Sequence, residues 1–391
     1  MSHSPQAVID AVRDLLPVLR ERAQEVEDRR ALPTETVKSL ADSGVFRLLQ
    51  PARYGGHEAH PVTFLTAVRL IASACGSTGW VSSVIGVHNW QLALFPDQAQ
   101  ADVWEADTEV RMSSSYAPTG TVAAVDGGYR LRGRWSFSSG CDHARWALLG
   151  GIVPGADGQP GDFRTFLLPA DDYVIDDVWD TVGLRGTGSN DIVVADAFVP
   201  EHRSLSFADT ARCVCPGQRS NTAPLYRIPY GSLFSYAITT PIIGMAEGAY
   251  QAHVSYQRER VRAAYIGSRA AEDPFTQVRV AEASADLAAA VLAMEHNMRE
   301  LMEVVAADTR IPLPLRLRIR RDQVRGTGQA IGAVDRLFEN SGGRALVAGT
   351  PIQRFWRDAH AGRVHAINDP ERAMVMFGKG EFGLDIADAM L

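Results

Sequence analysis

Features of secreted and membrane proteins are scarce in this sequence. Its 391 residues contain four cysteines, too few and too scattered for a disulfide framework, so we interpret them as free thiols. They are Cys75, Cys141, Cys213 and Cys215. The sequence has no run of about 18 apolar residues and does not begin with a basic segment followed by an apolar one. We therefore expect a cytoplasmic protein without a membrane partner.

Positive charge is also scarce. The 39 Lys and Arg residues are outnumbered by 46 Asp and Glu residues, which gives a formal net charge of −7. Binding to nucleic acid or anionic lipid requires clustered Lys and Arg side chains, so we expect neither partner. His, Cys and Asp residues do not occur at metal-ligand spacing, and we expect no metal.

What is present is an ordinary globular composition whose pattern changes along the chain. Apolar residues recur at helical spacing in residues 1–108, and short alternating runs broken by glycine follow in residues 109–210. Residues 211–232 carry several prolines and glycines without a period, which suggests a lid or a mobile loop. Helical spacing returns in residues 233–391. These patterns predict an N-terminal helical domain, a β domain and a C-terminal helical bundle.

Some individual helices can also be placed. Thr34 is the expected N-cap of an early helix with Glu35 in its first turn. A long helix is expected over residues 277–302, and a second should follow Pro312 and run to residue 338.

Four strings, each in the expected class of structure, carry a family resemblance. They are Pro51-Ala-Arg-Tyr54-Gly55-Gly56, Trp135-Ser-Phe-Ser-Ser139-Gly140, Val182-Gly183-Leu-Arg-Gly186-Thr-Gly188-Ser189, and Ser341-Gly342-Gly343 with Arg354-Phe-Trp-Arg357-Asp358-Ala359. The chain resembles the acyl-CoA dehydrogenase superfamily over nearly its whole length. The resemblance implies a mainly α fold with a central β-barrel or sandwich domain, a flavin between this domain and the C-terminal bundle, and a homotetramer.

One position separates two activities within that superfamily. Dehydrogenases take a substrate proton with a glutamate, in many members nine residues after the arginine of the Arg-Asp pair, and here that count from Arg357 reaches Ala366. Alanine cannot accept a proton, although Glu371 could substitute after a local shift. With His365 beside the missing carboxylate, the chain resembles the monooxygenase branch. In that branch a separate NAD(P)H-dependent reductase supplies reduced FMN or FAD, which reacts with O2 to give a flavin hydroperoxide.

A set of candidate catalytic residues follows from this branch. The chain is similar to oxygenase components of the p-hydroxyphenylacetate hydroxylase type at Trp80, His88, Ser114, Ser139 and His365. The resemblance implies that Ser114 hydrogen-bonds the phenolic oxygen, that Ser139 and Trp80 lie at the flavin, and that His88 lies near flavin and substrate. A free phenol has a pKa of about 10, so hydroxylation needs a base, and His365 is the expected one.

Other candidates have equally ordinary structural interpretations. Tyr116 is a further substrate residue, and Asp369 could orient His365 if a helix continued between them, which Pro370 opposes. The expected flavin-binding residues are Trp80, Ser139, Trp135, Arg260, Arg262, Gly342 and Gly343. The tryptophans could instead be core aromatics, and the arginines a solvated helix face. The choice of Ser114 and Ser139 among neighbouring serines allows a slip of one residue.

A nicotinamide site is not expected. Gly183-Leu-Arg-Gly186-Thr-Gly188 resembles a dinucleotide-binding motif, but that motif needs a strand before it and a helix after it, whereas these glycines fall between strands.

At finer grain the chain resembles the secosteroid phenol hydroxylases of cholesterol degradation. Strings that carry this are Cys75-Gly-Ser-Thr-Gly-Trp80, Gly86-Val-His-Asn-Trp90 and Ser138-Ser-Gly-Cys-Asp-His143. The resemblance implies ortho-hydroxylation of a phenolic ring to a catechol. Residues 204–220 depart most from it, so a hydroxylase acting on another aromatic or heteroatom substrate stays open, as do a dehydrogenase and a non-catalytic helical scaffold.

Overall fold

The computed structural model describes residues 4–155, 161–262 and 267–386. Its N-terminal part is helical, as predicted. The helices are α1 (Pro5–Glu21), α2 (Ala23–Arg29), α3 (Thr34–Asp42), α4 (Pro61–Ala74), α5 (Gly76–Leu92) and α6 (Asp97–Trp104). Helix α3 begins at Thr34, and its N-cap is Pro33. The N-cap predicted at Thr34 is therefore wrong by one residue.

The central segment forms two four-stranded sheets, with the strand orders β1-β4-β5-β8 and β2-β3-β7-β6. The strands are β1 (Met112–Ser115), β2 (Thr121–Val125), β3 (Gly128–Ser138), β4 (Trp146–Val153), β5 (Asp162–Pro169), β6 (Val174–Asp176), β7 (Asn190–Pro200) and β8 (Ser204–Ser206). β1 pairs with β4 in parallel, and the other pairs in these sheets are antiparallel. A separate apolar core, which includes Leu131, Trp135 and Phe166, lies within this β segment.

The C-terminal part is a bundle of long helices. These are α8 (Tyr230–Glu259), α9 (Pro274–Ala306), α10 (Leu313–Ser341), α11 (Pro351–Arg363) and α12 (Pro370–Glu381). Helix α9 begins where the Asp273 side chain accepts from the Phe275 N–H and Pro274 takes the first helical position, a favourable start for a helix. The two helices expected from residue 277 and after Pro312 are α9 and α10, so both predictions are confirmed.

Residues 211–232, where a lid or a mobile loop was expected, contain short regular elements. They hold the end of the short helix α7 (Phe207–Arg212), two 3-10 turns (Pro216–Arg219 and Pro224–Arg227) and the start of α8, and Leu225 and Tyr226 are buried. Elements of three to six residues are too short to show a period, which is why the sequence pattern missed them.

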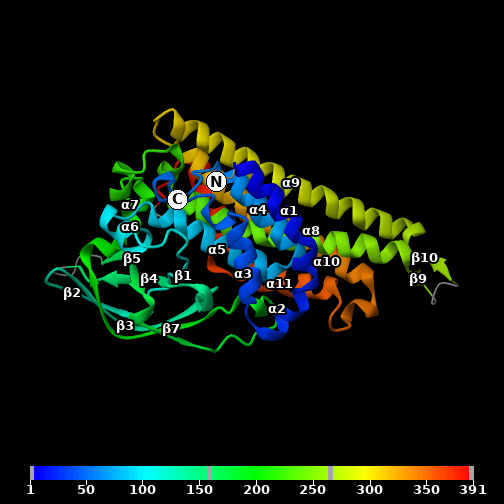
Figure 1. Cartoon of the computed structure of the whole chain (residues 1–391). Helices are drawn as coiled ribbons and strands as arrows, with labels where there is room; N and C mark the ends of the chain where they lie inside the picture. Colours follow the sequence, from blue (N-terminus) through cyan, green and yellow to red (C-terminus); the bar gives the residue numbers. More distant parts are fainter. Residues whose placement is uncertain (1–3, 156–160, 263–266, 387–391) are drawn as a thin grey trace.

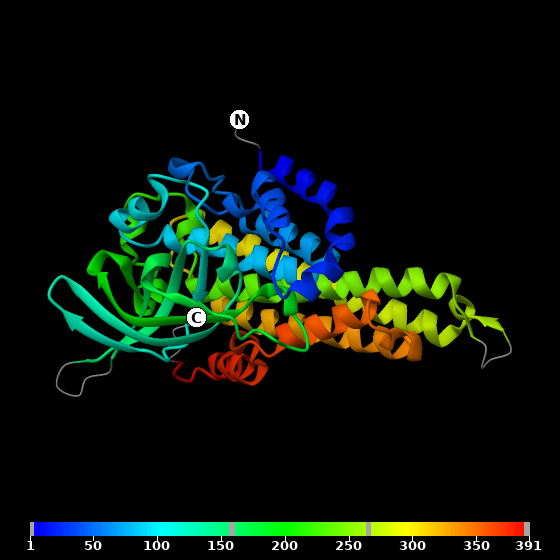
Figure 2. The ribbon, with the colours of Figure 1, turned by 60° about the horizontal axis from the view of Figure 1, so that its bottom comes forward.

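Helix α5 is the element that positions the site. All of its residues are buried, and it packs against α4, α8, α11, β1 and the 3-10 turn η6 (Arg185–Thr187). A helix that is covered on every side must find hydrogen-bond partners for its polar side chains inside the protein. In Figures 1 and 2 the sheets lie at one end of the molecule, and the small β9–β10 hairpin (Val261–Arg262 and Ser268–Arg269) lies at the other.

Candidate functional site

Three of the predicted site residues meet where α5 approaches the end of α11. The Trp80 indole N–H donates to Ser139 Oγ at 3.1 Å, and the Trp80 and His365 ring centroids lie 6.0 Å apart. A Cβ at Gly362 would lie 2.9 Å from the Trp80 ring, so only glycine lets α11 come this close to it. The structure therefore joins α5, the segment after β3 and the segment after α11.

Ser139 is the first of three side-chain hydroxyls that are linked by hydrogen bonds. We call them the hydroxyl chain (Ser139, Ser189 and Thr187). Ser139 Oγ lies 2.7 Å from Ser189 Oγ, which lies 2.6 Å from Thr187 Oγ1. Thr187 in turn donates to the Leu184 carbonyl at 2.8 Å. The sequence string Val182 to Ser189 marked this segment as important but did not indicate that its hydroxyls reach Ser139.

The loop that carries Thr187 and Ser189 is held from several sides. The Asp358 carboxylate on α11 accepts the Leu184 N–H at 2.6 Å, and the Thr187 carbonyl accepts the Gly140 N–H at 2.9 Å. Leu184 and Gly188 both adopt left-handed backbone conformations, with φ of 53° and 51°. Burial raises the pKa of Asp358 to about 6, against the opposing effect of its hydrogen bond from Leu184.

A second group of predicted residues surrounds Tyr116, directly after β1. The His88 and Tyr116 rings meet edge to face with centroids 6.3 Å apart. The Tyr116 hydroxyl donates to Gln91 Oε1, and burial raises the pKa of Tyr116 to about 12. Ser114 lies on β1, two residues before Tyr116. Gln91 was not predicted. His88 follows Trp80 by eight residues on α5, so the two groups are separated by roughly 12 Å along the helix axis.

His88 presents a proton acceptor. Its Nδ1 lies 2.9 Å from the Met112 carbonyl, which can only accept, so the ring hydrogen is on Nδ1 and the lone pair is on Nε2. That Nε2 is buried and has no hydrogen-bond partner among the described residues. Burial lowers the pKa of His88 to about 4, so the ring is neutral at pH 7.

His365 has the opposite arrangement. Its Nδ1 accepts the Ile367 N–H at 3.2 Å, so the hydrogen of the neutral ring is on Nε2. Burial lowers the pKa of His365 to about 4. In this form His365 offers a hydrogen-bond donor at Nε2, and the role of a base expected from the sequence stays a prediction. It also lies beyond α11, which ends at Arg363, and it caps the 3-10 turn η13 (Ala366–Asn368).

The carboxylates near His365 serve other purposes. The Asp369 side chain accepts the Arg372 N–H at 3.2 Å and caps α12, so it does not orient His365 as expected. Ala366 and Glu371 are both exposed, and Glu371 lies in the first turn of α12. The local shift that would make Glu371 a dehydrogenase base is not seen.

Strand alternation would place Trp135 and Phe137 on the same face of β3, but the structure separates them. Trp135 is fully buried in the β core and donates its indole N–H to the Gly150 carbonyl at 2.7 Å, so it does not belong with the flavin-binding residues. An irregular register between Trp135 and Ser138 turns Phe137 outward, with φ of +70° and 69% of the side chain exposed. A bulky residue in this conformation is strained and points to a functional constraint. The sequence string around Ser139 indicated that this segment is important. The apolar pattern of β3 did not indicate the register shift at Phe137.

Arg260, Gly342 and Gly343 come together, but not near Ser139. Arg260 donates to the carbonyls of Asn340 and Ser341 at 3.1 and 2.8 Å, and a Cβ at Gly342 would lie 2.6 Å from its guanidinium. The group adjoins β9, at the end of the molecule opposite the sheets (Figures 1 and 2). The Arg262 side chain lies outside the described residues.

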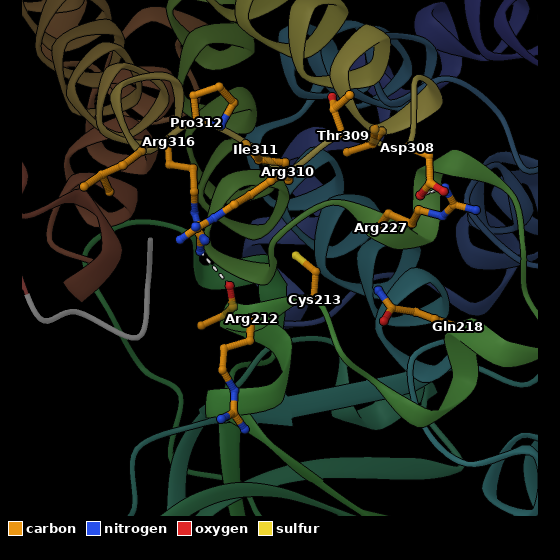
Figure 3. A pocket seen from close by; sticks show the side chains of 13 residues that line it. Arg212, Cys213, Gln218, Arg227, Asp308, Thr309, Arg310, Ile311, Pro312 and Arg316 are labelled. Atoms are coloured by element: carbon orange, nitrogen blue, oxygen red, sulfur yellow. Dashed lines mark hydrogen bonds and ion pairs between the residues drawn. The ribbon is translucent and has the colours of Figure 1, made fainter.

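A cavity of about 990 Å³ lies between α7 and the start of α10, and it is distinct from both groups. Figure 3 shows Arg212, Arg227, Arg310 and Arg316 around it, with Arg316 donating to the Ala211 carbonyl at 2.8 Å. None of the predicted site residues lines this cavity. The cavity therefore does not mark the catalytic groups.

Two absences hold within the described ranges. No group of three or more His, Cys, Asp or Glu side chains is arranged there to hold a metal ion. Nor is any helix in those ranges both long and apolar enough to cross a membrane. The four cysteines are free, as predicted.

The residues around Ser139 fit a flavin. An isoalloxazine ring needs a flat apolar surface and a few hydrogen-bonding groups at its polar edge. Phe137 offers an exposed aromatic face, with the Trp179 ring edge-on at a centroid distance of 6.0 Å. Ser139 keeps hydrogen-bonding capacity beyond its bond from Trp80. The left-handed backbone at Phe137 keeps this ring exposed beside Ser139, where it could contact a bound flavin ring.

Comparison with known families and proteins agrees with these features. Residues 2–106 match the family model "Acyl-CoA dehydrogenase, N-terminal domain", and residues 236–370 match "Acyl-CoA dehydrogenase, C-terminal domain". The chain is 60% identical to the flavin-dependent monooxygenase oxygenase subunit HsaA of Rhodococcus jostii, over 96% of this chain and 98% of that protein. It is 55% identical to the Mycobacterium tuberculosis protein of the same name, over 99% and 98%.

A solved structure extends the agreement to three dimensions. The crystal structure of 3-HSA hydroxylase from Rhodococcus sp. RHA1 superimposes with a TM-score of 0.95 at 59% identity, covering 98% of this chain and 99% of that one. The predicted fold class is confirmed.

Proposed function

This chain belongs to the acyl-CoA dehydrogenase family and, within it, to the flavin-dependent monooxygenases, and on that premise we propose that it is the oxygenase component of a two-component aromatic hydroxylase. The reaction adds one hydroxyl group ortho to a phenolic hydroxyl and gives a catechol. The observation that carries the proposal is the meeting of Trp80, Ser139 and His365 beside Ala366, where a dehydrogenase would need a carboxylate.

The flavin would lie against Trp80, Phe137 and Ser139. When bound, reduced flavin would supply two electrons to O2, so that one oxygen atom could enter the ring while the other leaves as water. FMN and FAD share the isoalloxazine ring that these residues fit, so we propose either as the reduced flavin, with O2 as the co-substrate.

Arg260, Gly342 and Gly343 lie too far from Ser139 to serve the same flavin in one chain. We propose that they contact the flavin phosphates of a neighbouring subunit, together with Arg262 by family resemblance, in a homotetramer. A guanidinium beside a glycine-rich turn is suited to a phosphate, because both approach it closely with N–H donors.

The phenol would lie between the two histidines. Electrophilic attack needs phenolate character at the ring, and the lone pair on His88 Nε2, which has no partner among the described residues, would accept the phenolic proton. The Nε2–H of His365 and the hydroxyl of Ser114 would then donate to the oxygen and stabilise its charge. This division of roles is an alternative to the single base expected at His365.

We propose that four packed aromatic rings exclude water from the substrate pocket. We call them the aromatic wall (Tyr116, Phe207, Tyr230 and Phe234). The Tyr116 ring contacts the other three edge to face, with centroid distances of 5.9, 6.0 and 5.4 Å. Phe207 comes from α7, in the segment that departs most from the resembling hydroxylases, and it stacks on Phe163 at 4.2 Å. We propose that this segment shapes the pocket for the part of the substrate beyond the phenol.

For the substrate we propose a phenolic secosteroid, because the similar crystal structure is that of a 3-HSA hydroxylase. The second candidate is a hydroxylase of the same type that acts on another aromatic or heteroatom substrate. It is favoured because the segment that contains α7 departs most from the resembling hydroxylases. Relatives are named as oxygenase subunits or components, which supports a separate NAD(P)H-dependent reductase.

The test supplies chemically reduced FMN or FAD to the purified chain in aerated buffer, without NADH. With a phenolic secosteroid we expect catechol in proportion to the flavin supplied. A panel of simple phenols tests the second candidate. Failure of every phenol with both flavins would contradict the proposed function, and anaerobic bleaching of bound oxidised flavin by an acyl-CoA would indicate a dehydrogenase instead.

A further inference from the structure

The hydroxyl chain of Ser139, Ser189 and Thr187 has a definite hydrogen-bond direction at one end. Trp80 Nε1 can only donate, so Ser139 Oγ accepts there at 3.1 Å. Ser139 then keeps one lone pair and its own hydrogen for two further partners, which are Ser189 and whatever lies in the site. All three hydroxyl residues are at least 90% buried, so water does not complete their bonding freely.

At the Thr187 end the hydrogen bond of the hydroxyl chain is easily exchanged. The Leu184 carbonyl faces three donors: the Trp179 indole N–H at 2.8 Å, the Thr187 backbone N–H at 3.1 Å and the Thr187 hydroxyl at 2.8 Å. A carbonyl oxygen has two lone pairs, so it can accept well from only two of these three donors. The Thr187 hydroxyl can therefore turn away from Leu184 toward Ser189 at little cost.

Two arrangements of the three hydrogens follow. In the outward arrangement Ser139 donates to Ser189, Ser189 donates to Thr187, and Thr187 donates to Leu184, which leaves Ser139 with a free lone pair toward the site. In the inward arrangement Thr187 donates to Ser189 and Ser189 donates to Ser139, which leaves the Ser139 hydrogen free toward the site. Each O–H bond only rotates, and no proton enters or leaves the chain.

We propose that Thr187 and Ser189 are positioning residues that let Ser139 change between hydrogen-bond acceptor and donor as the flavin changes oxidation state. N5 of a reduced flavin carries a hydrogen and needs an acceptor, whereas N5 of an oxidised flavin carries a lone pair and needs a donor. The outward arrangement serves the first and the inward arrangement serves the second. The inference rests on the proposed function, since it requires flavin beside Ser139.

The heavy atoms are held still while the hydrogens turn. Asp358 fixes Leu184, the Gly140 N–H fixes the Thr187 carbonyl, and the left-handed residues Leu184 and Gly188 shape the loop between them. A rigid frame with mobile hydroxyl hydrogens can match both flavin states without a movement of the backbone.

The test compares the dissociation constants of reduced and oxidised flavin under anaerobic conditions. Thr187→Val removes the far hydroxyl, so Ser189 can satisfy its own hydrogen only by donating to Ser139, which leaves Ser139 as a donor. We expect reduced flavin to weaken roughly three- to tenfold relative to oxidised flavin, the worth of one neutral hydrogen bond. Ser189→Ala should shift the ratio in the same direction, because Ser139 then has no partner for its hydrogen when it accepts from the flavin.

Two control variants separate this effect from loss of structure. Thr187→Ser retains the hydroxyl and should restore the wild-type ratio. Ser138→Ala removes a buried hydroxyl next to Ser139 that has no partner among the described residues, and it should leave the ratio unchanged. Thermal unfolding of each variant shows whether the protein is folded at the temperature of the titration.

Each outcome decides the proposal. A shifted ratio in Thr187→Val that returns in Thr187→Ser supports it, and an unchanged ratio in both Thr187→Val and Ser189→Ala overturns it while the proposed function stands. If Thr187→Val does not fold, Ser189→Ala against Ser138→Ala carries the same comparison. If the wild-type chain binds no reduced flavin, the proposed function itself fails and the inference fails with it.

Discussion

His88 and His365 use the same ring nitrogen, Nδ1, in opposite ways. His88 donates from it to the Met112 carbonyl, and His365 accepts at it from the Ile367 N–H. Both rings are neutral at pH 7, because burial lowers the pKa of each to about 4. The remaining nitrogen of His88 is therefore an acceptor and that of His365 is a donor, which gives the two histidines different roles toward a phenol.

The donor role of His365 can be separated from a base role with two substitutions. His365→Gln retains an N–H donor but cannot take a proton, whereas His365→Ala retains neither. If His365 donates, catechol formation should fall roughly tenfold in the alanine variant and less in the glutamine variant. Release of H2O2 should rise as catechol formation falls.

The same pair of variants contradicts the donor role if both lose activity equally and by roughly a hundredfold or more, as expected for a lost general base. Catechol and H2O2 are measured in one reaction, so that uncoupling is distinguished from slow turnover.

The acceptor role of His88 predicts a large effect at a residue whose Nε2 has no partner in the described part of the chain. His88→Asn can still donate to the Met112 carbonyl but offers no lone pair at the position of Nε2. Catechol formation should fall roughly a hundredfold or more at pH 7, while reduced flavin binds as before. A variant with nearly normal turnover would show that another group takes the phenolic proton.

His88 also makes the stability of the fold depend on pH. Its folded pKa of about 4 lies below the ordinary value of 6.5, so between these values the unfolded chain binds the proton and the folded chain does not. The free energy of unfolding should therefore fall as the pH falls from 6.5 to 4, by up to about 3 kcal/mol from this residue. Urea unfolding across this range should show that the free energy of unfolding changes less with pH in His88→Asn than in the wild type. An equal change in both would show that another group causes the pH dependence.

Trp135 and Phe137 should respond in opposite ways to substitution. Trp135→Phe leaves the Gly150 carbonyl without its donor inside the β core and should cost about 1–3 kcal/mol of folding free energy. Phe137→Ala should leave stability nearly unchanged but weaken flavin binding, because the Phe137 ring is exposed and buries little area without a ligand. Thermal unfolding and flavin titration of both variants test this, and unchanged flavin affinity in Phe137→Ala would remove Phe137 from the site.

Much of the fold followed from the sequence because its signals are local. The start of α9 depends on Asp273 and Pro274, and α10 follows Pro312, so helix capping and proline geometry predict both. The short elements before α8 were missed because four to six residues are too few to show a repeating apolar pattern. The end of α11 before His365 follows from tertiary packing, which no helical pattern contains.

The candidate site was predicted in part. The motif strings led to Trp80, Ser139 and His365, which meet in the structure. The directions of their hydrogen bonds depend on backbone groups such as the Met112 carbonyl and the Ile367 N–H, whose positions are set by the whole fold. For the same reason the hydroxyl chain and the outward turn of Phe137 could not be seen in the sequence.

The central claim, that this chain hydroxylates a phenol with reduced flavin and O2, is tested most directly with isotopic oxygen. Reduced flavin, a phenolic secosteroid and the purified chain are mixed under ¹⁸O2 in unlabelled water, and the catechol is analysed by mass spectrometry. We predict one ¹⁸O atom in each catechol molecule, at the new hydroxyl group. Catechol that carries oxygen from water, or the absence of catechol while the flavin is oxidised, would contradict the account.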